Sequence, residues 1–128
     1  MKILSKLTII TLLFITGCST TPNTYKTISA KDAQAKMTTS EDVVLLDVRT
    51  PAEYEEKHIQ GSILIPDYDI ETEIETQIPN KDTTIIVYCR SGNRSRNVAN
   101  KLITMGYNDV YDLGGINNYP YTENIVTN

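Results

Sequence analysis

The chain contains little cysteine, little histidine and few positive charges. Its 128 residues include two cysteines, Cys18 and Cys89, and one histidine, His58. One histidine and one free thiol are too few for a structural zinc site, which usually takes about four side chains, so we expect no metal. The formal net charge of -4 excludes nucleic-acid binding through general electrostatic attraction.

A long apolar run is also missing. The stretch from Leu7 to Ile15 is shorter than the roughly 20 residues of a bilayer-spanning helix. It follows Lys2 and Lys6 and precedes small residues, which is the layout of a secretory signal. An uncleaved N-terminal anchor or an ordinary signal peptide would fit this layout as well.

The end of this stretch, "ITGC" at residues 15–18, resembles the lipobox of bacterial lipoproteins. The resemblance implies that residues 1–17 are a lipoprotein signal peptide and that Cys18 is acylated. The protein would then be exported and anchored to a membrane of the cell envelope by its N-terminal lipid.

The remaining chain has the size of one domain. Removal of residues 1–17 leaves 10 basic and 16 acidic residues, a net charge of -6. We interpret residues 18–26 as a tether and residues 27–128 as a single domain with one small core.

Strand-like and helix-like segments alternate along this domain. Residues 43–48 and 83–88 are continuous apolar runs, typical of strands buried on both faces. Residues 28–37 and 96–106 have helical patterns, and Ser29 is expected to cap the first helix. The alternation predicts an α/β fold: one doubly wound domain with a mainly parallel sheet flanked by helices.

The sequence also predicts a helix that begins at Pro51. Thr50, Pro51 and Glu53 have the order of a capping box with proline at the first helical position. Glu53 is therefore expected to be a cap or a partner for Arg49.

Cys89 directly follows a predicted apolar strand and precedes a predicted helix. Arg90 and Arg94 are close to it in sequence, and Gly92 allows the chain to turn its N–H groups inward. These groups, with the start of the following helix, favour the thiolate and should lower the pKa of Cys89. The same arrangement would hold an anionic substrate beside a nucleophilic sulfur.

Three motifs in order resemble the rhodanese-like sulfurtransferases. "CRSGNRS" at residues 89–95 resembles the active-site loop of that family. "LLDVRTPAEYEEKHIQGSILIP" at residues 45–66 and "YDLGGINNY" at residues 111–119 resemble its upstream and closing elements. The resemblance covers residues 28–119, nearly the whole domain.

This resemblance implies a reaction and its partners. Cys89 would take a sulfane sulfur from a small anionic donor such as thiosulfate, become a persulfide, and pass the sulfur to a thiol or a cyanide-like acceptor. No cofactor is implied, and we expect a monomer. The residues that would cradle the persulfide and its donor are those of the loop: Arg90, Ser91, Gly92, Asn93, Arg94 and Ser95.

Other residues near the motifs are given supporting roles. Asp47 and Arg49 flank a strand end and are interpreted as an ion pair or loop brace behind the site. His58 matches a structural turn position of the family. The chain departs from the family pattern at Lys57, where glycine is usual, at Ser62, where alanine is common, and at Tyr119, where tryptophan is usual.

Two other classes of function remain open. The first is a non-enzymatic module that carries sulfur, senses redox state or binds a partner. The second is a cysteine phosphatase or arsenate reductase. Cysteine phosphatases have five residues between the cysteine and the arginine of their active-site loop, whereas four residues separate Cys89 from Arg94.

Overall fold

The computed structural model describes Gly17 and residues 22–128, so residues 1–16 and Cys18 lie outside the described residues. The elements in chain order are β1 (Lys26–Thr27), α1 (Ala30–Thr39), β2 (Val43–Asp47), α2 (Pro51–Glu56), β3 (Lys57–Ile59), β4 (Ile63–Leu64), the 3₁₀ helix η1 (Asp67–Asp69), α3 (Ile70–Gln77), β5 (Thr84–Cys89), α4 (Asn93–Thr104), β6 (Asp109–Gly115), the 3₁₀ helices η2 (Ile116–Asn118) and η3 (Thr122–Asn124), and β7 (Ile125–Thr127). Within this described part, no helix is long and apolar enough to cross a membrane.

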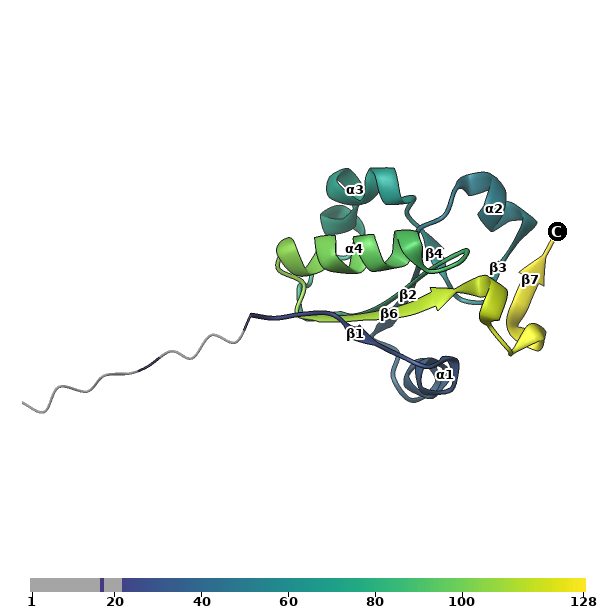
Figure 1. Ribbon diagram of the computed structural model, residues 1–128, viewed down its shortest axis with the longest axis horizontal. Helices are drawn as coiled ribbons and strands as arrows, with labels where there is room; N and C mark the ends of the chain where they lie inside the picture. The colour runs from purple at the N-terminus through teal and green to yellow at the C-terminus, as the bar shows by residue number, and fades with distance from the viewer. Residues whose placement is uncertain (1–16, 18–21) are drawn as a thin grey trace, which may run out of the picture.

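The central sheet is parallel throughout its described strands. Five strands in this part of the chain pair in the order β1-β6-β5-β2-β4, each parallel to its neighbour. Helices cover both faces, with α3 and α4 on one side and α1 on the other (Figure 1). The predicted α/β fold with a mainly parallel sheet flanked by helices is therefore confirmed.

The central strand β5 is buried on both faces, as its apolar sequence indicates. Ile85, Val87 and Cys89 belong to the core beneath α3 and α4. Ile86 and Tyr88 belong to the second core, beneath α1. The alternation of side chains along a strand supplies both cores from one apolar run.

Both predicted helix caps are present. The Ser29 hydroxyl accepts a hydrogen bond from the Asp32 N–H at 3.1 Å at the start of α1. At the start of α2, the Glu53 N–H donates to the Thr50 hydroxyl at 3.3 Å, and the Glu53 carboxylate accepts from the Thr50 N–H. The capping box thus fixes the backbone of a helix of only six residues.

A small antiparallel sheet was not anticipated from the sequence. Strands β3 and β7 pair from Lys57 opposite Thr127 to Ile59 opposite Ile125. This pairing holds the carboxyl end of the chain against the segment that follows α2. At the other end, β1 begins at Lys26, the last residue of the predicted tether, and pairs with β6.

The topology places a crevice at the carboxyl ends of β2 and β5. From β2 the chain moves to β4 on one side, and after β5 it moves to β6 on the other. The connections therefore diverge between β2 and β5, which is where ligands bind in doubly wound sheets. Asp47 ends β2 and Cys89 ends β5, so both lie at this switch point.

Candidate active site

Cys89 is the last residue of β5 and its side chain is almost fully enclosed, with 1% of its surface exposed. Its position follows from strand alternation, since Val87 occupies the same face two residues earlier. The sulfur lies 3.5 Å from the Ser95 hydroxyl and accepts a hydrogen bond from the Gly92 N–H at 3.0 Å. Residues 89–95, called the thiol loop below, therefore curl around the sulfur.

Two glycines allow the thiol loop to adopt this shape. Gly92 has φ of 112°, in the region that side chains with a Cβ rarely adopt. Gly115 lies beside Cys89 in the sheet, and a Cβ there would come within 2.7 Å of the Ser91 Cα. The loop thus rests directly on the backbone of β6, and α4 begins at the residue after Gly92.

The thiol loop lowers the pKa of Cys89. Burial alone would raise that pKa, but hydrogen bonds from the Ser95 hydroxyl and from the N–H groups of Ser95, Gly92 and Ser91 outweigh it. These groups all favour the charged sulfur. The predicted direction of the shift is confirmed, and hydrogen bonds from the loop are its main cause.

The Ser95 hydroxyl can hydrogen-bond to the Cys89 sulfur in either of its protonation states. Its hydroxyl lies 3.1 Å from the Gly92 carbonyl as well as near Sγ. With a neutral thiol, S–H donates to Ser95 and Ser95 donates to the carbonyl. When the proton leaves, the Ser95 O–H is free to rotate and donate to the thiolate.

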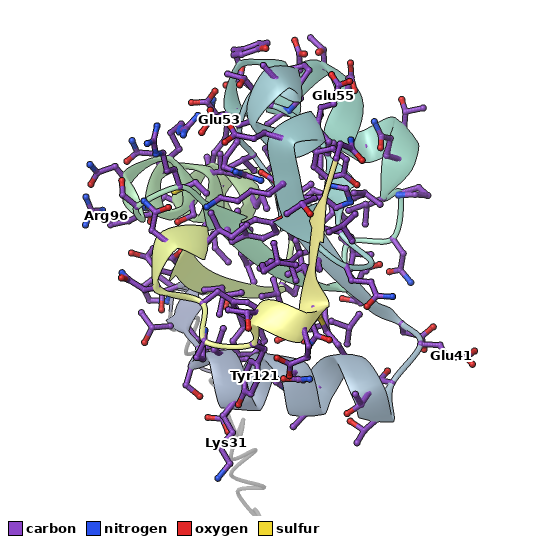
Figure 2. All side chains as sticks on the ribbon, turned by 90° about the vertical axis from the view of Figure 1, so that its right-hand side faces the viewer. Lys31, Glu41, Glu53, Glu55, Arg96 and Tyr121 are labelled. Carbon is purple, nitrogen blue, oxygen red and sulfur yellow. The ribbon has the colours of Figure 1, made fainter. Side chains whose placement is uncertain are left out.

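Arg94 is held by Glu53. Its Nη1 and Nη2 lie 2.8 and 2.9 Å from the two carboxylate oxygens of Glu53, a bidentate ion pair between α4 and α2. In Figure 2 the labelled Glu53 lies on the side of α2 toward α4. Glu53 is thus both the expected cap and an ion-pair partner, but its partner is Arg94 and not Arg49.

This ion pair affects both of its members. The Arg94 guanidinium is the main reason that the pKa of Glu53 falls from 4.5 to about 2. The pKa of Arg94 is raised, chiefly by Glu53 and to a smaller extent by the charge of Cys89. Arg94 therefore keeps a full positive charge near the sulfur and ties the thiol loop to α2.

Arg90 lies at the entrance to the thiol loop. Its side chain is exposed and lines a small pocket of about 100 Å³ together with Arg49, Glu53, Glu56, Lys57 and Asn117. We call this the mouth pocket. Two other residues of the thiol loop lie near Arg90 in sequence. Ser91 is exposed at the tip, and the Asn93 side chain accepts a hydrogen bond from Arg96 at 3.0 Å.

Asp47 and Arg49 form the brace that their sequence positions suggest. Arg49 Nη2 lies 2.7 Å from Asp47 Oδ2, and both side chains are buried. Arg49 Nη2 also donates to the Lys57 carbonyl at 2.6 Å, so the pair fixes the start of β3 to the end of β2. Removal of either charge would leave the other buried and unpaired, which is strongly destabilising.

Tyr88 connects this brace to Ser62. The Arg49 guanidinium lies over the Tyr88 ring, 5.7 Å from its centre. The Tyr88 hydroxyl lies 3.0 Å from the Ser62 hydroxyl and accepts from the Ile59 N–H at 3.1 Å. Ser62, one of the departures from the family pattern, therefore supplies a buried hydrogen bond.

The sequence reasoning missed the residues that complete the mouth pocket from the carboxyl end. The Asn117 N–H donates to the Arg90 carbonyl at 3.3 Å, and Asn117 lies just after β6. Gly115 belongs to the motif "YDLGGINNY", but its neighbours in sequence do not indicate that it would contact the thiol loop. His58 stacks on Tyr54 at 3.8 Å and lies in β3, so it occupies a structural position in a strand, where the family match indicated a turn.

Apart from the thiol loop, the part of the chain that the structure describes has a large pocket but no cluster of metal ligands. Among Gly17 and residues 22–128 there is no group of three or more His, Cys, Asp or Glu side chains suited to a metal ion. A pocket of about 630 Å³ lies at the amino ends of β2 and β5, where Asp42, Val44 and Thr84 line it. It is therefore at the opposite end of the sheet from Cys89.

Comparison with known proteins places the chain beside sulfurtransferases. The family model described as the Rhodanese-like domain matches residues 29–120. Thiosulfate sulfurtransferase PspE of Escherichia coli is 39% identical over 71 residues, 56% of this chain and 68% of that protein. A sulfurtransferase of Allochromatium vinosum is 35% identical over 88 residues, 69% of this chain and 80% of that protein.

A solved structure, described as rhodanese with anions from E. coli, has the same fold. It superposes with a TM-score of 0.59 at 32% identity and covers 67% of this chain and 99% of that one.

Loss of the Ser95 hydroxyl should raise the pKa of Cys89. Ser95→Ala removes the largest of the contributions that favour the thiolate and leaves the three backbone donors in place. The titration is followed by the ultraviolet absorbance of the thiolate, after subtraction of a Cys89→Ser protein. Thr104→Ala, which removes an exposed hydroxyl from the far end of α4, is the matched control. An unchanged midpoint in Ser95→Ala would show that its hydroxyl does not stabilise the thiolate.

The Glu53–Arg94 pair should make stability depend on acid. Because the pKa of Glu53 is lowered on folding from 4.5 to about 2, its contribution is complete above about pH 4.5 and is lost as the pH falls toward 2. Glu53→Gln should destabilise the protein by about 1–2 kcal/mol at pH 7, after allowance for solvent screening, and by much less near pH 2. Denaturant unfolding at both pH values measures this.

Glu55→Gln is the control for this experiment. Glu55 lies on the same helix, projects away from α4 (Figure 2), and makes no ion pair within residues 22–128. The same loss in both variants, or a loss in Glu53→Gln that does not change with pH, would contradict the assignment.

Proposed function

Because the chain belongs to the rhodanese-like family, we propose that it transfers sulfane sulfur from thiosulfate to a thiophilic acceptor through a persulfide on Cys89. The relatives confirm the expectation of an enzyme of the thiosulfate sulfurtransferase type.

The observation that carries the proposal is the hydrogen-bonded sulfur at the switch point. Cys89 combines an enclosed sulfur, a lowered pKa and inward N–H groups at the start of a helix. Such a loop supports a nucleophilic thiolate and then the anionic outer sulfur of a persulfide. Among the described residues Cys89 is the only cysteine, so no other described residue offers it a thiol for a disulfide.

The reaction proceeds in two displacements. The Cys89 thiolate attacks the outer sulfur of thiosulfate, a new S–S bond forms, and the old S–S bond breaks as sulfite leaves with its electron pair. The acceptor then attacks the outer sulfur of the persulfide, and the Cys89 thiolate leaves. Each step conserves charge and needs neither a cofactor nor an added proton.

The two loop arginines have different tasks in this reaction. Arg94 uses two N–H groups on Glu53 and retains others, so it holds the loop closed and contributes charge near the sulfur. Arg90 is exposed at the mouth pocket and attracts the dianionic donor.

We also propose that the domain acts at the outer side of a membrane. The support is the sequence at residues 15–18, which resembles a lipobox behind a charged start and a short apolar run. The first strand among the described residues begins at Lys26, so the predicted tether, residues 18–26, would connect a lipid on Cys18 to the sheet.

Exposure to thiosulfate should add the mass of one sulfur atom to the protein, on Cys89. Cyanide or a small thiol should remove it, because either nucleophile can attack the outer sulfur. Mass spectrometry of the intact chain measures both steps. Cys89→Ser should neither gain the mass nor turn over, whereas Thr104→Ala, at the far end of α4, should gain it.

Two other results would replace the proposal. If the protein gains no sulfur from thiosulfate but cleaves an aryl phosphate, it is a phosphatase. If it does neither and the pKa of its thiol is near an ordinary value of about 8.5, it is a binding or redox-sensing module.

Substitution of Cys18 should release the protein from membranes. Each buried CH₂ of an acyl chain contributes about 0.8 kcal/mol of binding, so loss of the lipid site removes the anchor. Cell fractionation of Cys18→Ala should find the protein soluble or unprocessed, while Ser19→Ala should remain with the membrane. Native protein that is soluble and carries a free Cys18 would contradict lipidation.

A further inference from the structure

A groove of about 550 Å³ lies beside the mouth pocket, along β7. The β7 strand crosses the face that is turned to the viewer in Figure 2. Ile116, Tyr119 and Ile125 form the apolar part of the groove, and Thr122 and Thr127 line it with hydroxyls. We call it the β7 groove. Its volume falls in the range of about 300–1,000 Å³ that holds small organic molecules.

The β7 groove is continuous with the mouth pocket. Lys57 and Asn117 line both of them. Asn117 donates its N–H to the Arg90 carbonyl at 3.3 Å, which places one end of the groove directly against the thiol loop. Arg90 follows Cys89 directly in the chain, so a molecule bound beside Arg90 in the mouth pocket can extend its far end along β7.

Charge and polarity change along this path. Lys57, Arg90 and Glu56 make no ion pair with any described residue, so two cations and one carboxylate stand unpaired at the mouth pocket and give it a net positive charge. They do so in a chain whose formal net charge is -4. Beyond Lys57, the groove is lined by Ile116, Tyr119 and Ile125. The order from the sulfur outward is thus cationic and then apolar, which complements a thiolate with a carbon body.

We propose that the β7 groove binds the carbon body of an organic thiol that accepts sulfur from Cys89. The proposal rests on the sulfurtransferase function proposed above and adds the class of acceptor. The thiolate attacks the outer sulfur of the Cys89 persulfide, the S–S bond to Cys89 breaks, and an organic persulfide leaves with the Cys89 thiolate restored. One S–S bond forms as one breaks, and the charge is conserved.

Strand β7 offers a matched pair of positions for a test. Ile125 and Thr127 line the groove, and Val126 between them does not. This follows from the alternation of side chains along a strand. Val126 is 36% exposed on the other side of β7. The substitution of valine or isoleucine by threonine keeps a β-branched side chain that suits a strand and adds a hydroxyl.

The experiment compares mercaptoethanol with mercaptohexanol, two neutral thiols that differ only in the length of their carbon chain. The full chain is loaded with thiosulfate, freed of donor, and discharged with each thiol while mass spectrometry follows the loss of sulfur. Each rate constant is divided by that of the same thiol with a small aromatic disulfide, which corrects for intrinsic reactivity. The readout is the ratio of the corrected rate constants.

The native protein should prefer mercaptohexanol at least about tenfold, since each CH₂ that enters an apolar groove contributes up to about fourfold. Ile125→Thr should reduce the ratio several-fold, and Val126→Thr should leave it unchanged. Val126→Thr places the same hydroxyl on the same short strand, so it controls for a general loss of stability.

Three results would overturn the proposal. A native ratio near one, with cyanide and mercaptoethanol both discharging the persulfide, would reject the groove and leave the sulfurtransferase function standing. Failure to gain sulfur from thiosulfate would reject that function and the groove together. A dimer in size-exclusion chromatography that Ile125→Thr dissociates would identify the groove as a contact between two copies.

Discussion

The backbone turn at Gly92 is the constraint on which the site depends. Its φ of 112° directs the Gly92 N–H back to the Cys89 sulfur at 3.0 Å and allows α4 to begin at the next residue. A side chain at Gly115 would collide with the Arg90 carbonyl and Ser91, so the loop can close only over a bare backbone. The chemistry at Cys89 therefore depends first on backbone geometry and then on charge.

Ionic and polar contacts hold helix α2 beside the thiol loop. Helix α2 has no buried residue, so apolar packing contributes little to its position. It is fixed by the capping box at Thr50, the Glu53–Arg94 ion pair and a hydrogen bond from the Tyr54 hydroxyl to the Ser62 carbonyl at 2.7 Å. Helix α2 therefore places charged side chains, Glu53 and Glu56, at the mouth pocket beside an apolar core.

The features predicted from sequence are those with a local physical signal. Continuous apolar runs identified β2 and β5, and the caps at Ser29 and Thr50 were recognised because a helix start depends on a few adjacent residues. The thiol loop was recognisable for the same reason.

The features that were missed depend on distant partners. Glu53 and Arg94 are 41 residues apart, and neither residue's neighbours specify the other. Strand β3 begins with Lys57 and His58, which have no strand-like alternation, and it forms only because β7 pairs with it.

That dependence has a consequence for biosynthesis. The early strands β1 and β3 pair with β6 and β7, which are the last strands to be synthesised. Long-range pairings of this kind form slowly, since the intervening chain must close first. A chain that is still emerging therefore exposes two unpaired early strands until β6 and β7 have been synthesised, so both sheets are completed only when nearly the whole domain is available.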